Sequence, residues 1–449
     1  MIQVNESQIQ DSLRREAIPL RRDEISDYDP LLDFIGDARF VLIGDASHGT
    51  HEFYRERAQI TKRLIMEKGF SAVAVEADFP DANRLNRYVN GSDVDADAVE
   101  AMANFERFPA WMWRNADVLD FIGWLRAHND ELTAKQTKTG FYGLDLYSLH
   151  ASIDAVLTYL QKIDPEAASR AQERYSCFDH FGKDSQRYGY ATGLGIAESC
   201  EAEVVSQLTE LHDRSFELVR RDGPVAEDDF FYAEQNARLV KNAERYYRMM
   251  YRNDVSSWNL RDQHMMETLV ALDAHLSLPG KKAKIVVWEH NSHLGDARAT
   301  EMGKRGEWNV GQLTRQRYEN EAILIGFTTH SGTVTASTDW GGPAERKQVR
   351  PSLTGSYERI FHDTGLDRFL LLMPHGSHVS EALRSPRLER AIGVIYRPET
   401  ERQSHYFHTS LSRQFDAVIH IDETRAVEPL ERTVKWEEGE VLETFPSGI

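Results

Sequence analysis

Acidic and imidazole side chains recur directly after short apolar runs of this sequence. The run Phe40–Ile43 leads into Asp45, Ser47 and His48, and later runs lead into Glu76, Asp145, His290, His293 and His330. In an open α/β sheet, ligands bind beyond the carboxyl ends of the strands. A single such residue is more often a turn or cap residue, but five coincident strand ends predict a cleft suited to general acid–base chemistry.

Arg57 lies on the apolar face of the helix predicted after the first run. It follows Phe53 by four residues and precedes Ile60 by three, so all three share one side of the helix. The guanidinium could reach water along its packed stem, or it could pair with a carboxylate at the rim. Because an unpaired buried charge is strongly destabilising, we expect Arg57 to contact Glu76, with Asp45 as the alternative partner.

Ser47 could be a nucleophile, since it lies beside His48 between a strand and a helix. The spacing of Gly44, Ser47 and Gly49 is one residue longer than in the nucleophile elbow of hydrolases. Adjacent side chains also rarely hydrogen-bond as nucleophile and base. We therefore expect Ser47 to cap the following helix and His48 to face the cleft.

A metal-dependent mechanism is a second alternative for the same rim. In it, His290, His293 and a carboxylate such as Glu76 would bind a divalent ion that activates water. A His-x-x-His pair in a loop supports this weakly, because only the i, i+4 spacing of a helix turns two imidazoles toward one metal. We therefore expect no metal and no other cofactor.

Water attack without a metal or a covalent step uses most of the candidate residues. His48 would take a proton from water, and Asp45 or Glu76 would orient its ring. Arg57 and His290 would stabilise the charge that develops on the substrate.

The elements that must position these residues appear as short apolar runs bounded by polar residues or glycine. Such runs are typical of strands buried on both faces, and eight occur: Phe40–Ile43, Ala72–Val75, Phe141–Leu144, Ile285–Trp288, Ile323–Phe327, Phe369–Leu372, Ile392–Ile395 and Ala417–Ile421. Long helical patterns lie between several of them. The predicted class is therefore α/β, with a central, mostly parallel sheet flanked by helices.

The middle of the chain has a different pattern, because strand-like runs vanish between about residues 151 and 280. Long helical patterns replace them, notably Phe230–Tyr251 and Ser257–Leu276. We predict an α/β domain of residues 1–150 and 280–449 with an inserted helical subdomain of residues 151–279. Tyr175–Gly195, rich in Gly, Ser, Asp and aromatic residues, is predicted to be a long loop, and such loops are often lids.

The composition excludes several classes of function. The 449 residues carry 53 Lys and Arg against 72 Asp and Glu, a net charge of −19 that argues against a nucleic-acid partner. The only cysteines, Cys177 and Cys200, are too few for a disulfide framework or an iron–sulfur cluster and suit a reducing compartment. No apolar run approaches the roughly 18 residues of a membrane span, and no signal peptide is evident. We expect a cytoplasmic protein with no membrane partner.

The run GDASHGTHEFYRERAQITKRLI, followed by AVAVEADFPDANR, resembles the erythromycin esterase family of hydrolases, which open macrolactone rings. The resemblance continues through RFPAWMWRN, FYGLDLYSL, WNLRDQHM, WEHNSHLGDAR and NVGQLTRQRYENEAILIGFTTHSG, and so covers nearly the whole chain. It implies a general base at His48 and supporting roles for Asp45, Arg57, Glu76 and His290. Further supporting candidates are His293, His330, Asp145 and Arg261.

The expected function is hydrolysis of a small-molecule ester or lactone. The macrolide-inactivating members carry Glu at the position of Asp45, and a side chain one methylene shorter moves the carboxylate by about 1 Å. We therefore do not predict a macrolide as the natural substrate. A rival hypothesis is a non-catalytic protein that binds an anionic or metal-bearing small molecule at the same rim.

Overall fold

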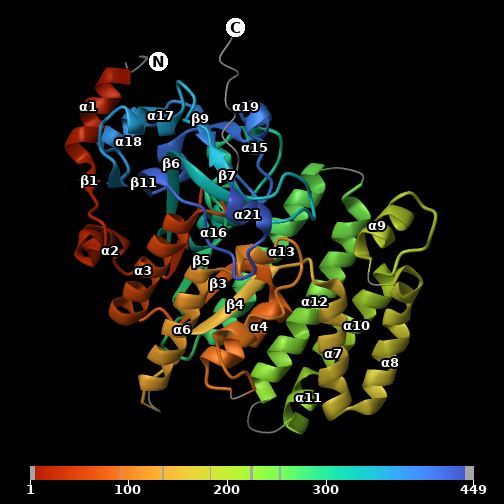
Figure 1. Ribbon diagram of the computed structural model, residues 1–449. Coiled ribbons are helices and arrows are strands. Elements are labelled where there is room, and N and C mark those ends of the chain that lie inside the picture. The colour runs from red at the N-terminus through yellow and green to blue at the C-terminus, as the bar shows by residue number, and fades with distance from the viewer. Residues whose placement is uncertain are drawn as a thin grey trace.

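A mixed sheet of nine strands forms the centre of the molecule (Figure 1). The computed structural model describes residues 6–439 except 93, 134–135, 183, 223–225 and 252–253. The strand order is β1-β8-β11-β6-β2-β5-β3-β4, with β7 paired to β6, and the pairs from β11 through β4 are all parallel. The strands are β1 Ile18–Pro19, β2 Phe40–Ile43, β3 Ala72–Asp78, β4 Gly140–Asp145, β5 Ile285–Trp288, β6 Ala322–Ala336, β7 Glu345–Val349, β8 Arg368–Leu372 and β11 Ala417–Thr424. The predicted α/β class is confirmed.

One predicted strand is wrong, and the other seven apolar runs lie in strands of the sheet. Ile392–Ile395 is buried at its first residue but forms only isolated bridges, Ile392 to Ser47 and Ile395 to Ser337. The Ile392 amide donates to the carbonyl of Ala46. The run therefore crosses the loop after β2 instead of joining the sheet, and burial alone gave it the appearance of a strand. A separate two-stranded ribbon, β9 Arg387–Arg390 with β10 Tyr406–Thr409, was not predicted.

Helices cover both faces of the sheet because each central strand is apolar on both sides. In β2, Val41 and Ile43 pack into one core and Phe40 and Leu42 into the other. The first core is closed by α2 Asp29–Ile35, α3 His51–Lys68, α4 Phe79–Val89 and α6 Ala116–Glu131. The second is closed by α1 Glu6–Glu16, α13 Asp254–Leu276, α16 Val310–Tyr318, α17 Tyr357–His362, α18 His378–Ala382 and α20 Leu411–Gln414.

Helix α3 confirms the predicted apolar face. Phe53 and Ile60 are fully buried, and Arg57 between them is only 1% exposed. Gly69 ends the helix with φ of 70°, a left-handed conformation that favours glycine. The sequence was therefore sufficient to show that Arg57 points inward.

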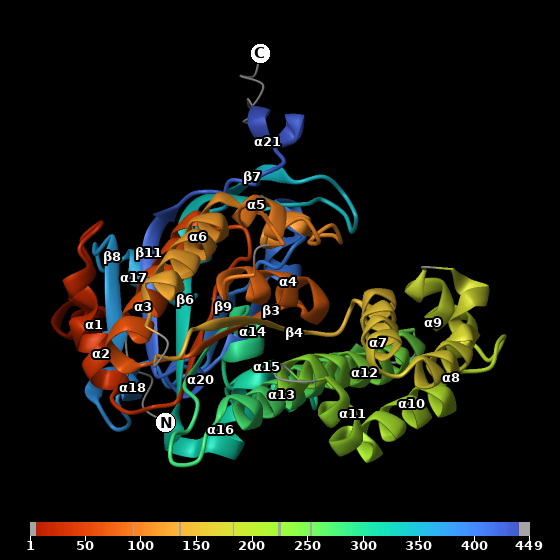
Figure 2. The ribbon, with the colours of Figure 1, turned by 90° about the horizontal axis from the view of Figure 1, so that it is seen from below.

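The segment between β4 and β5 is helical wherever the structure describes it, apart from connections and an isolated bridge at Leu278. Its helices pack on one another around a hydrophobic core of their own, and they extend to one side of the sheet (Figure 2). They are α7 Leu149–Ile163, α8 Pro165–Tyr175, α9 Ser185–Gly193, α10 Glu201–Asp213, α11 Ser215–Asp222 and α12 Ala226–Met249, after which α13 returns to the sheet. The division into two domains stays a prediction.

Tyr175–Gly195 is not the long loop that the sequence suggested. It contains the 3-10 helix η3, Ser176–Phe181, and the whole of α9. Asp184 caps α9 by accepting from the Arg187 amide, and Tyr188 is buried with its hydroxyl on Glu244. Turn-forming residues here are helix caps, which is why their composition was misleading.

Cys177 and Cys200 form a disulfide, which the sequence analysis did not predict.

None of the described helices has both the length and the apolar character that crossing a bilayer requires.

Short helical segments complete the described chain. The remaining segments are η1 Ile25–Tyr28, α5 Ala98–Ala101, η2 Ala110–Met112, α14 Asn291–Leu294, η4 Ala297–Ala299, α15 Glu301–Lys304, η5 Glu319–Glu321, η6 Pro398–Thr400, α19 Glu401–Ser404 and α21 Val434–Glu438.

Candidate active site

A cavity of about 310 Å³ opens at the carboxyl ends of the four adjacent strands β2, β5, β3 and β4. The last residues of β3 and β4 place Glu76 and Asp145 in its wall, the segments after β2 and β5 place His48, His290 and His293 there, and α13 adds Arg261. Four of the five predicted strand ends therefore meet at one rim. Five aromatic side chains also line the wall: Phe105, Trp113, Tyr147, Trp258 and Trp340.

His48 lies between two carboxylates. Its Nδ1 is 3.5 Å from Asp45 Oδ1, and its Nε2 is 3.9 Å from Glu76 Oε1. Burial alone would lower the pKa of His48, but the charges of Asp45 and Glu76 outweigh it and raise the pKa. The ring is thus held ready to accept a proton, and its contacts are long enough to tighten when a substrate is bound.

Arg57 pairs with Asp45, not with Glu76 as predicted. Its Nη1 donates to Asp45 Oδ2 at 2.8 Å, and both side chains are about 1% exposed. The guanidinium is held against the rings of Tyr54 and Trp288, at 4.6 and 5.3 Å from their centroids. Burial opposes ionisation of Asp45, but Arg57 and then His48 outweigh it, so the pKa of Asp45 is lowered. Arg57 is not among the residues that line the cavity, and it hydrogen-bonds to Asp45, which lies beside His48.

Arg261 is the partner of Glu76, and it binds Asp145 as well. Its Nη2 donates to Glu76 Oε1 at 2.6 Å and to Asp145 Oδ2 at 2.7 Å, while Nε donates to Asp145 Oδ1 at 3.0 Å. The second oxygen of Glu76 accepts from the His290 amide at 2.9 Å. Burial would raise the pKa of Glu76, but His293, His48 and Arg261 outweigh it and hold the pKa far below its usual range. Glu76 is therefore a fixed anion.

His293 is fixed from both ring nitrogens. Its Nδ1 is 2.9 Å from Asp262 Oδ1, and its Nε2 accepts from Arg261 Nη1 at 3.1 Å. Because an arginine can only donate, these bonds assign the proton to Nδ1. The ring of Trp258 stacks on the imidazole at 4.4 Å. Asp262 was missed from the sequence, although it lies in the quoted motif WNLRDQHM beside Arg261.

His290 has a free ring N–H beside His48. The Ser292 amide donates to His290 Nδ1 at 3.2 Å, which assigns the proton to Nε2. No described residue accepts a hydrogen bond from that Nε2, and the two imidazole centroids are 4.9 Å apart. Burial first, and His48 second, lower the pKa of His290 to about 4. His290 is thus a neutral hydrogen-bond donor in the cavity wall.

Ser47 is buried away from the cavity. Its hydroxyl bonds to the Thr50 hydroxyl, and the side chain is 1% exposed. The predicted cap is wrong, because Thr50 is the N-cap residue of α3 and no side-chain cap bond is present. Ser47 is not one of the described residues that line the cavity.

His330 does not belong to this site, contrary to the prediction. Strand β2 ends level with Ile325 of β6, but β6 continues to Ala336. His330 therefore lies five residues further along β6, about 16 Å at the rise of a strand. The apolar run Ile323–Phe327 marked only the first third of this strand, so its predicted end was too early.

The donor set of the main site does not fit a divalent cation. The Arg261 guanidinium lies 2.6 Å from Glu76 and 3.1 Å from His293, so a positive charge already occupies the position between these would-be ligands. His290 offers only a protonated nitrogen to the cavity. Metal independence stays a prediction, and it rests on these contacts.

Acidic groups outnumber cationic ones in the cavity wall. Besides the residues above, the wall holds Asp78, Asp81 and Arg107, which the sequence did not single out as site residues. Arg107 Nε donates to Asp78 at 2.7 Å. Burial, and then the charge of Asp78, raise the pKa of Asp81 to about 7. Glu76, Asp78, Asp81 and Asp145 thus face Arg107 and Arg261.

Known proteins match the chain over most of its length. The erythromycin esterase family model matches residues 65–424. Erythromycin esterase type II of Escherichia coli is 21% identical over 422 residues, which cover 90% of this chain and 94% of that protein. A crystal structure of a Bacillus cereus protein has a TM-score of 0.80 at 20% identity and covers 96% of this chain and 100% of that one. A mutant of the erythromycin esterase EreC, in its open conformation, has a TM-score of 0.67 at 18% identity, covering 91% and 96%.

Proposed function

This chain belongs to the erythromycin esterase family, and on that premise we propose that it hydrolyses a carboxylic ester or lactone with water activated by His48. Family membership supports a hydrolase of the esterase type. The observation that carries the finer proposal is the position of His48, in the cavity wall and between the ionised Asp45 and Glu76.

In the first step, His48 would accept a proton from water as the water oxygen attacks the ester carbonyl. The imidazolium that forms is stabilised by Asp45 at 3.5 Å and Glu76 at 3.9 Å. Arg57 holds Asp45 from behind and is a positioning residue. Carboxylates that orient and stabilise a histidine base in this way are a recurring device in hydrolysis.

The negative charge on the former carbonyl oxygen needs a hydrogen-bond donor within the cavity. His290 Nε2 is such a donor, and its lowered pKa keeps the ring neutral near pH 7. When the tetrahedral intermediate breaks down, His48 returns its proton to the leaving alkoxide, which yields one acid and one alcohol. Arg261 holds Glu76, Asp145 and His293 in place around this reaction.

The substrate should be neutral or cationic, with a large apolar surface. Aromatic rings form much of the wall, and the acidic side chains there exceed the cationic ones. An ester with a free carboxylate would be repelled by this wall. Erythromycin, the lactone in the name of the Escherichia coli relative, is of this general chemical type and should be among the compounds tested.

A screen of neutral, cationic and anionic esters and lactones on the purified protein tests the proposal. We expect multiple turnovers on at least one neutral or cationic compound, and loss of turnover in His48→Ala. Saturable binding without product would instead favour the rival hypothesis of a binding protein. Activity that follows a specific added metal would favour the metal-dependent mechanism.

A further inference from the structure

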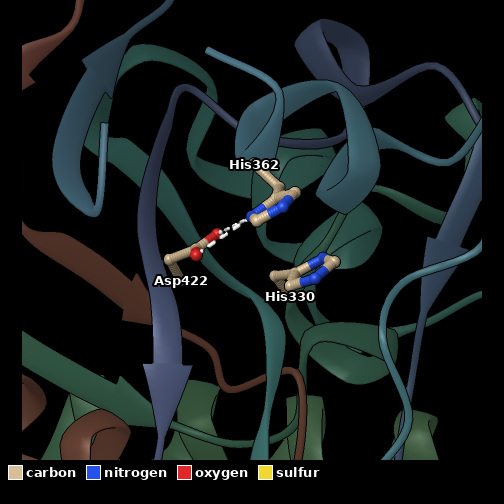
Figure 3. Close-up of side chains that lie close together, drawn as sticks. All are labelled: His330, His362 and Asp422. Atoms are coloured by element: carbon tan, nitrogen blue, oxygen red, sulfur yellow. Dashed lines mark hydrogen bonds and ion pairs between the residues drawn. The ribbon is translucent and has the colours of Figure 1, made fainter. Parts of the chain in front are cut away.

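Three side chains that could ligate a metal meet outside the cavity just described (Figure 3). His330 comes from β6, His362 from the end of α17 and Asp422 from β11. One donor atom of each lies within 4.8 Å of the others. His362 Nδ1 is 2.8 and 3.0 Å from the two oxygens of Asp422. The main-cavity mechanism uses none of these residues.

Neighbouring side chains orient the three. Ser352 Oγ lies 2.6 Å from His330 Nδ1, which leaves His330 Nε2 for a ligand. His420 Nε2 lies 3.4 Å from Asp422 Oδ1, and Thr328 Oγ1 lies 2.9 Å from His420 Nδ1. Supporting hydrogen bonds of this kind fix the tautomer and direction of metal ligands in proteins.

The cluster is accessible, and nearby cations are engaged elsewhere. The side chains of His362 and Asp422 are 36% and 21% exposed, so an ion can enter from solvent. Arg359 pairs with Asp363 at 3.0 Å. Arg390 donates to the His330 carbonyl at 3.0 Å and lies 3.2 Å from Glu401.

We propose that His330, His362 and Asp422 bind one divalent transition-metal ion, with zinc as the best-matched metal. Two imidazoles and one carboxylate are a preferred zinc donor set, and a fourth position is left for water. The ion would replace the proton shared by His362 and Asp422. It would tie α17 to β6 and β11, away from the main cavity.

Coordination requires one movement. The rings of His330 and His362 are stacked in parallel at 3.6 Å, so their lone pairs do not yet converge. Metal–ligand bonds of about 2.0–2.1 Å place neighbouring ligand atoms about 3.3 Å apart. The donors now lie within 4.8 Å of one another, and we expect a turn of one imidazole about its Cβ–Cγ bond to close this spacing when the ion binds.

Calorimetric titration of the metal-free full chain with zinc tests the site. We expect one zinc ion per chain, and loss of binding in His362→Ala and Asp422→Asn. Ser352→Ala should weaken binding by about 10–100-fold, the range found for supporting shells. Two controls should bind as the parent does: His378→Ala, an exposed histidine elsewhere, and His293→Ala, at the main cavity.

Two further measurements keep the result clear if a variant is destabilised. Zinc should raise the Tm of the parent chain but not that of folded His362→Ala, and cobalt in place of zinc should give the visible spectrum of a histidine-ligated site. The proposal is overturned if no zinc binds, if binding survives in both ligand variants, or if His293→Ala abolishes it. None of these outcomes depends on ester hydrolysis.

Discussion

Replacing Asp45 by Asn tests whether His48 is the base, because it removes one charge and keeps the size of the side chain. Asp45 Oδ1 lies 3.5 Å from His48 Nδ1. At that distance and an effective dielectric constant of about 20, opposite unit charges attract by at most about 5 kcal/mol. Opposite charges at close range shift measured pKa values by about 1–3 units. The carboxylate raises the pKa of His48, so its loss must lower it.

We therefore expect the acid limb of kcat/KM to move to lower pH by about 1–3 units in Asp45→Asn. The plateau should fall by about 10²–10⁴-fold, because the ring loses the group that orients it. The assay is the pH profile of kcat/KM on a neutral activated ester, so that ionisation of the substrate does not contribute.

Asp262→Asn is the matched control, since Asp262 bonds to His293 and not to His48. It should reduce activity without moving the acid limb. Asp45→Asn leaves Arg57 buried without its anionic partner, which should destabilise the fold by about 3–5 kcal/mol. Thermal melts must therefore show that the variant is folded before its activity is measured. If the single variant does not fold, Asp45→Asn with Arg57→Met removes both charges. A folded variant with an unchanged acid limb would refute the role of His48 as base.

Three other outcomes follow from the same geometry. Ser47→Ala removes the hydrogen bond to Thr50, so it should lower the free energy of unfolding by about 0.5–1.5 kcal/mol and leave turnover unchanged. His48→Ala should instead reduce the rate by about 10²–10⁴-fold. An acyl adduct trapped on Ser47 would contradict both expectations. Exhaustive chelation should leave turnover intact, because Arg261 fills the position of a metal, and recovery with one specific ion would argue otherwise. The preference for a cationic over an anionic ester should grow as pH rises through about 7, where Asp81 ionises, and Asp81→Asn should abolish that dependence.

Much of the candidate site could be predicted because strand ends are local features of the sequence. The carboxyl ends of β3 and β4 and the segments after β2 and β5 carry chemical residues directly after buried apolar runs, and parallel strands place their carboxyl ends at one edge. The inward direction of Arg57 was equally local, since it follows from the helical repeat. Neither inference required knowledge of which strands are neighbours in the sheet.

Misassigned segments share a different cause, since their composition fits two structures equally well. Ile392 is buried as a strand residue would be, yet it bridges only the loop after β2. Asp184 is a residue type common in loops, yet here it caps a helix. His330 followed an apolar run, but β6 continues beyond it by pairing with β11 and β7. For Ile392 and for β6, a partner segment far away in sequence decided the structure, whereas Asp184 was misread although its partner, the Arg187 amide, is three residues away.

The partner of Arg57 was missed for the same reason, and strand order explains it. Strand β5 lies between β2 and β3, so Glu76 is two strands away from the end of β2, about 10 Å at the usual strand spacing. Asp45 is in the loop that joins β2 to α3, and it is within reach of Arg57. The cation for Glu76 comes instead from α13, which the chain forms just before β5. Inserting β5 also brings His290 beside both His48 and Glu76, so one feature of topology places the proposed oxyanion donor next to the base and one of its two carboxylates.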